Sequence, residues 1–130
     1  MLLIRDDRYE EMALAYQCHL IALLDAALQH NGITEAKKCR NIVERFLFQL
    51  GHFHDQGWLR PTAEAEKAYP LLCFTETFLN SNTSVEDLGS VLAPSPLFSF
   101  HEYSMGNTEL FYDNDPDAIV ETGNFGDGEA

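Results

Sequence analysis

Apolar side chains recur at helical spacing through the first quarter of the chain. Between residues 6 and 30 they fall three or four positions apart, at Tyr9, Met12, Ala13, Tyr16, Leu20, Leu23, Leu24, Ala27 and Leu28. This spacing predicts an amphipathic helix. Asn31-Gly32 supplies its end, because glycine accepts the left-handed conformation common at helix C-termini.

A second helical stripe follows Thr34, which can cap the helix from its side-chain oxygen. The apolar positions of this stripe are Ile42, Val43, Phe46, Leu47 and Leu50. The stripe predicts a helix that ends at Gly51 or Gly57. Two helices joined by a short glycine loop form an antiparallel hairpin.

The second half of the chain carries short apolar runs of strand length. Residues 58–61, 69–74, 90–94 and 97–103 are predicted strands, and residues 83–87 have the capping pattern of a one-turn helix. From residue 113 the chain becomes acidic and poor in apolar residues, which predicts a mobile tail. The predicted fold is α+β: in residues 1–112 an N-terminal antiparallel helical hairpin packs on a small, mostly antiparallel sheet, and residues 113–130 form a flexible acidic tail.

Charge is the most informative compositional feature. The 130 residues carry a formal net charge of −13, and 45% of them are hydrophobic, as expected of one globular domain. Residues 68–130 contain no Lys or Arg but hold eleven of the 21 acidic residues. This balance argues against binding to nucleic acid or to an anionic membrane surface, since both require clustered cations. No apolar run has the length of about 18–20 residues that a membrane span requires.

The cysteines and the first residues favour a cytoplasmic location. Cys18, Cys39 and Cys73 are odd in number, far apart and set in apolar stretches, which predicts reduced core thiols. The first eight residues pass from three apolar positions to alternating charges, so they do not form the apolar region of a signal peptide.

Histidines supply the candidate chemistry. His52 and His54 could share a metal ion on a strand, but on a helix they lie about 200° apart and cannot chelate together. Asp55 could orient His101 as a general base only if the fold brings the two segments together. One hypothesis is therefore a small metal-binding or hydrolytic domain that uses His52, His54, Asp55 and His101. We find no cofactor motif, and no cofactor is predicted.

The favoured hypothesis is a non-enzymatic acidic protein that docks a basic protein partner, because negative potential speeds association with a cationic surface. In composition, though in no motif, the chain is similar to the small acidic immunity proteins of bacteria, which occlude the basic active site of a toxin. The third hypothesis is a structural homodimer that pairs through the helical hairpin, since the first helix is apolar around a wide arc. The predicted partner-binding residues are Trp58, Glu76, Glu86, Asp87, Glu102, Tyr112, Asp113 and Asp115.

Overall fold

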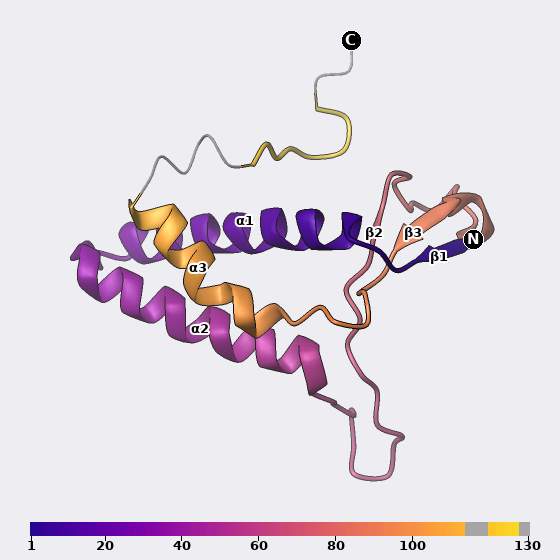
Figure 1. Cartoon of the computed structure of the whole chain (residues 1–130), viewed down its shortest axis with the longest axis horizontal. Coiled ribbons are helices and arrows are strands. Elements are labelled where there is room, and N and C mark those ends of the chain that lie inside the picture. The colour runs from indigo at the N-terminus through magenta and orange to yellow at the C-terminus, as the bar shows by residue number, and fades with distance from the viewer. Residues whose placement is uncertain (114–119, 128–130) are drawn as a thin grey trace.

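The computed structural model describes residues 1–113 and 120–127, and within them it has the α+β architecture predicted (Figure 1). The elements in chain order are β1 (Leu2–Ile4), α1 (Arg8–His30), α2 (Ala36–Gln56), β2 (Phe74–Thr75), the 3-10 helix η1 (Val85–Leu88), β3 (Ser90–Leu92) and α3 (Phe100–Asp113). The predictions of a mobile tail at residues 114–119 and 128–130 and of a binding role for Asp115 lie outside the described residues.

Both predicted N-terminal helices are present. α1 ends at His30, and Gly32 follows with a φ of +83°, the left-handed conformation that the Asn-Gly pair indicated. The residue that precedes α2 is Glu35 rather than Thr34, and α2 continues through Gly51 to Gln56. α2 runs back from the turn in the opposite direction to α1 (Figure 1).

The sheet is mixed rather than mostly antiparallel. Its strand order is β1-β3-β2, in which β1 pairs parallel with β3 and β2 pairs antiparallel with it. The strand at residues 90–92 and the short helix at 85–88 are where the sequence predicted them. The predicted strand at residues 58–61 is wrong, because only an isolated bridge joins Leu59 to Ala68 there. Of the predicted strand 69–74, only Phe74 belongs to a strand.

The largest departure from prediction is α3. Residues 97–103 alternate in part and were expected to form a strand, but a helix begins at Phe100. Its buried positions are Phe100, Ser104, Asn107 and Thr108. The last three lie four, seven and eight residues after Phe100, which places all four on one face of the helix. This face contacts both α1 and α2. Three of these four residues are polar, so an apolar stripe was absent from the sequence.

Two apolar clusters make up the core. Tyr9, Ala13 and Phe100 form one, against which side chains of β2 and β3 pack. Ile21, Val43 and Leu47 form the other, deep between the helices.

Buried polar groups join α1 to α3 between these clusters. Gln17 Nε2 donates to the carbonyl of Phe100 at 2.8 Å, and Asn107 Nδ2 donates to Gln17 Oε1 at 2.6 Å. Cys18 and Cys39 are buried in this core, as predicted, whereas Cys73 is only partly buried.

By length and mean hydropathy, α1 is the one helix in the described part of the chain that could cross a membrane. The core helix of a soluble protein meets the same test. Here α1 buries Tyr9, Ala13, Gln17, Cys18 and Ile21, and 22% of its apolar 18-residue window is buried within the fold.

Candidate functional site

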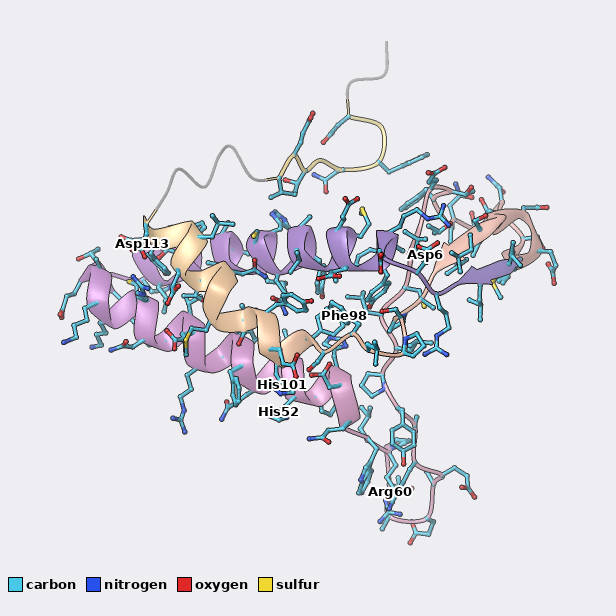
Figure 2. The ribbon with its side chains drawn as sticks, in the orientation of Figure 1. Asp6, His52, Arg60, Phe98, His101 and Asp113 are labelled. Atoms are coloured by element: carbon cyan, nitrogen blue, oxygen red, sulfur yellow. The ribbon has the colours of Figure 1, made fainter. Side chains whose placement is uncertain are left out.

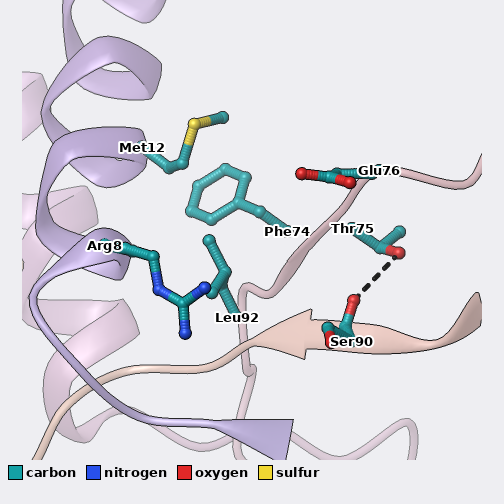
Figure 3. Close-up of a pocket in the computed structure, with 7 residues that line it drawn as sticks. All are labelled: Arg8, Met12, Phe74, Thr75, Glu76, Ser90 and Leu92. Carbon is teal, nitrogen blue, oxygen red and sulfur yellow. Dashed lines mark hydrogen bonds between the residues drawn. The ribbon is translucent and has the colours of Figure 1, made fainter. Parts of the chain in front are cut away.

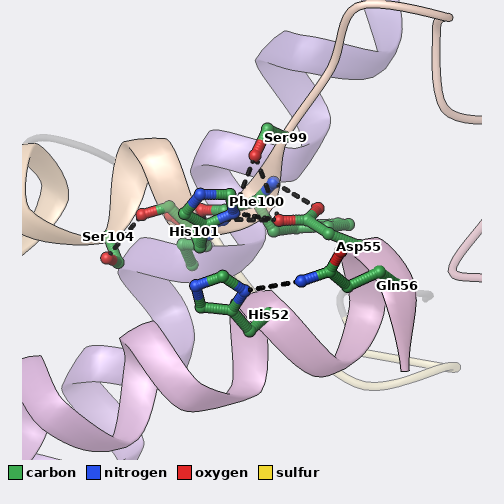
Figure 4. Close-up of polar contacts among 8 residues, drawn as sticks. His52, Asp55, Gln56, Ser99, Phe100, His101 and Ser104 are labelled. Carbon is green, nitrogen blue, oxygen red and sulfur yellow. Dashed lines mark hydrogen bonds and ion pairs between the residues drawn. The ribbon is translucent and has the colours of Figure 1, made fainter. Parts of the chain in front are cut away.

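The end of α2 and the start of α3 meet at Gly51. A Cβ atom added at Gly51 would lie 2.8 Å from the backbone N and Cα of His101, closer than real Cβ contacts allow. The missing side chain therefore lets the two helices approach backbone to backbone. This approach brings His52 and Asp55 of α2 beside Ser99 and His101 (Figure 4).

Asp55 is the centre of this cluster. One carboxylate oxygen, Oδ1, accepts the backbone N–H of Phe100 at 2.7 Å, and Oδ2 accepts the N–H of His101 at 3.0 Å. Oδ2 also lies 2.6 Å from His101 Nδ1 and accepts the Ser99 hydroxyl at 3.1 Å. Asp55 thus satisfies the first free N–H groups of α3 from another helix, which is the role of an N-cap supplied in trans.

The protonation state of Asp55 follows from these contacts. Burial opposes its ionisation, but the hydrogen bonds from the His101 ring, from the backbone of His101 and Phe100 and from Ser99 outweigh burial and lower the pKa of the carboxyl. Asp55 is therefore an anion placed at the positive end of the α3 dipole.

His52 lies flat against His101. The two rings stack with centroids 4.1 Å apart and planes inclined by 12°, and the Phe48 ring meets both edge-on. Gln56 Nε2 lies 3.2 Å from His52 Nδ1, one turn along α2.

His52 and His54, which were proposed to bind one metal ion together, contact different aromatic rings. His54 packs against the Phe100 ring, with centroids 5.2 Å apart, while His52 stacks on His101. Burial lowers the pKa of His54, which favours its neutral form. Within residues 1–113 and 120–127 no group of three or more His, Cys, Asp or Glu side chains is placed to hold a metal ion.

Ser99, His101 and Asp55 meet without the geometry of a nucleophilic triad. In such a triad the serine contacts one ring nitrogen and the carboxylate contacts the other. Here the Ser99 hydroxyl lies 2.9 Å from His101 Nδ1, the same nitrogen that faces Asp55. The arrangement therefore lacks the relay of a triad, and His101 Nε2 lies outside both contacts.

The residues predicted to bind a partner do not form one surface. Glu76, Glu86 and Asp87 lie around the sheet, Glu102 is exposed on the first turn of α3, and Trp58 belongs to the loop after α2. Figure 2 shows how far apart these regions are, with Asp113 at one end of the helices, Asp6 at the other and Arg60 on the loop.

Four of these residues already have partners within the chain. Glu86 accepts the Ser84 hydroxyl, and the other three are Tyr112, Asp113 and Trp58. The Tyr112 hydroxyl donates to Asp25 at 2.7 Å, and Asp113 pairs with Arg40 at 3.0 Å. Lys67 lies over the Trp58 ring, 4.3 Å from its centroid.

Two groups of functional interest escaped the sequence analysis. Asp6 and Asp7 belong to the less acidic half of the chain, but they connect β1 of the sheet to α1. Several large apolar residues at that end are exposed rather than buried. Their hydrophobicity was visible in the sequence, but their exposure depends on how few residues the small sheet can cover.

We compared the chain with models of known protein families, with curated proteins and with solved structures, and none of the three comparisons found a match.

Proposed function

We propose that the chain is a non-enzymatic acidic binding protein that docks a basic protein partner at its sheet end. The sheet end comprises residues 1–7 and 74–92, which contain β1, β2, η1 and β3 (Figure 1). The α1–α2 hairpin packed on the sheet is the scaffold in this proposal. The acidic segment 113–130 adds negative potential, and the protein acts in the cytoplasm.

The observation that carries the proposal is the exposure of large apolar side chains beside carboxylates. The exposed fraction of these residues is 49% to 62%, although the Phe78 ring also stacks on Phe125; the residues are Met1, Leu2, Leu3, Phe78, Leu79 and Val85. Clustered exposed apolar residues mark interaction sites on soluble proteins. The carboxylates of the sheet end are Asp6, Asp7, Glu76, Glu86 and Asp87; the nearby cations are Arg5 and Arg8 of the first turn of α1, and Arg8 pairs with Asp6.

The two kinds of residue have separate roles in docking. The carboxylates attract a cationic surface over several ångströms and raise the association rate, an effect that dissolved salt screens. The apolar side chains provide the dry contact at the centre of the interface, where charged residues are usually depleted. Of the residues that the sequence pointed to, Glu76, Glu86 and Asp87 fit this surface.

Charge reversal tests the proposal. The purified chain is immobilised and used to capture partners from the native host at low salt, and the captured protein is then measured by association kinetics. Two triple variants carry the same change in net charge at different places. The sheet-end variant is Glu76→Lys, Glu86→Lys, Asp87→Lys, and the control variant is Glu35→Lys, Glu64→Lys, Glu109→Lys.

The sheet-end variant is expected to slow association about tenfold or more, while the control variant retains most of the rate. Added salt should reduce the wild-type rate steeply and the sheet-end variant's rate much less. Equal losses in the two variants would show that net charge, rather than this surface, governs binding.

A second candidate function is supported by the contact between Asp55 and His101. An imidazole whose Nδ1 faces a carboxylate at 2.6 Å is held in one orientation, as a general base requires. In this alternative, a small hydrolytic domain uses His101 Nε2 to activate water. Replacement of His101 by Gln would abolish any such hydrolysis, whereas partner docking at the sheet end would persist.

A further inference from the structure

A groove of about 330 Å³ lies between the first turns of α1 and the sheet. Met12 of α1, Phe74 of β2 and Leu92 of β3 supply its apolar surface, and Arg8 and Glu76 supply opposite charges (Figure 3). This volume is at the lower end of the range of about 300–1,000 Å³ found for small-molecule sites.

The Arg8 guanidinium is held in place from one side. Its Nε and Nη2 lie 3.1 Å and 2.8 Å from the two carboxylate oxygens of Asp6. This fork fixes the plane of the guanidinium and leaves Nη1 outside both contacts.

Glu76 attracts Arg8 electrostatically but forms no ion pair with it. The attraction from Glu76 adds to that from Asp6 in raising the pKa of Arg8, so the two groups share one electrostatic environment. Yet the ion pairs within 4 Å in the described residues include Arg8–Asp6 and not Arg8–Glu76. A cation and an anion therefore both line the groove without forming an ion pair, and Figure 3 shows Phe74 and Leu92 between them.

We propose that this groove binds a free amino acid with an apolar side chain. The ligand carboxylate contacts Arg8, its ammonium group contacts Glu76, and its side chain packs on Met12, Phe74 and Leu92. A simple cation would be repelled by Arg8, and a simple anion would be repelled by Glu76 and Asp6. A zwitterion can instead pair its carboxylate with Arg8 and its ammonium group with Glu76. The groove shares Glu76 with the proposed docking surface, but amino-acid binding is measured on the isolated chain, without a partner.

Methyl NMR of the whole chain tests the site directly. The chain has three methionines, Met1, Met12 and Met105, so methyl labelling gives three signals of which only Met12 lines the groove. Addition of L-leucine at millimolar concentration is expected to shift the Met12 signal and leave the other two unchanged.

Two analogues of leucine separate the charges. Leucinamide lacks the carboxylate and N-acetylleucine lacks the ammonium group, and each is expected to bind at least about fivefold more weakly than leucine, as loss of one partly exposed charge pair implies. In Arg8→Gln the preference for leucine over leucinamide should disappear. In Glu76→Gln the preference over N-acetylleucine should disappear, while the control Glu86→Gln retains both preferences.

Three results would overturn the inference. The first is no shift of the Met12 methyl signal, and the second is an equal shift of all three methionines. The third is an affinity that either analogue leaves unchanged. If leucine binds as expected but the charge-reversal variants show no difference, the amino-acid site is supported and the docking surface is refuted. The two proposals can therefore fail separately.

Discussion

Replacement of Asp55 by Ala is expected to destabilise the protein by about 3 kcal/mol at neutral pH. The side chain of Asp55 is only 14% exposed, and it accepts hydrogen bonds from Ser99, from the backbone of Phe100 and from the backbone and ring of His101. Loss of an N-cap costs about 1 kcal/mol, and loss of a charge-assisted hydrogen bond costs about 1.5–3 kcal/mol. For a chain of this length the combined loss corresponds to a fall in Tm of roughly 10 °C.

The pH dependence distinguishes this mechanism from a simple loss of packing. The folded-state pKa of Asp55 is lower than the unfolded value of about 3.9, so its stabilisation is fully present above that value. The stabilisation is lost as the pH falls through the lower folded-state pKa. The difference in unfolding free energy between wild type and Asp55→Ala should therefore narrow below about pH 4.

Urea denaturation followed by circular dichroism, repeated from pH 7 to pH 3, measures both effects. Asp113→Ala is the matched control, because it removes a carboxylate whose ion pair with Arg40 is exposed and should cost less than about 1 kcal/mol. A loss below 1 kcal/mol for Asp55→Ala at pH 7, or a difference that stays constant on acidification, would refute the assignment of Asp55 as the cap of α3.

Two further predictions concern the contacts between helices. Gly51→Ala should destabilise the protein by about 2 kcal/mol because the added Cβ would meet the backbone of His101. The control Gly106→Ala has open space around it and should stabilise the protein by up to about 1 kcal/mol. Equal changes in Tm for the two variants would contradict the close approach of the helices. Gln17→Leu should cost about 2–3 kcal/mol because it leaves the Asn107 amide N–H and the Phe100 carbonyl without their bonds to Gln17. Adding Asn107→Leu should cost less than the sum of the two single changes in a urea-denaturation cycle.

The first two helices could be predicted because apolar residues recur along them at helical spacing, although Gln17 is also buried in α1. α3 could not be predicted because its buried face is largely polar. Ser104, Asn107 and Thr108 are buried by contacts with other helices, which local sequence does not display. One local signal was present: Ser99 and Glu102 have the spacing of a capping box ahead of a helix. The partial alternation of residues 97–103 favoured a strand over this signal.

The residues of the candidate site could be named from sequence, but their arrangement could not. His52, Asp55 and His101 were all candidates, and the sequence showed that Asp55 could reach His101 only through the fold. The approach depends on Gly51, whose role becomes apparent only when the opposing backbone is known. The same geometry decides the chemistry, because Ser99 and Asp55 share one nitrogen of His101.

The acidic residues are distributed differently in the folded structure than along the sequence. Asp6 and Asp7, from the first half of the chain, lie between β1 and α1, where Asp6 pairs with Arg8, and Glu76 of the second half lies in the groove that Arg8 lines. Folding carries Asp113 to the opposite end of the helices, where Arg40 neutralises it. Position in the fold, rather than membership of the acidic half, therefore determines which carboxylates can steer a partner. Reversal of Asp113 should leave association with a basic protein nearly unchanged although it alters net charge as much as reversal of Glu76, and an equal effect of both on the association rate would place the interface elsewhere.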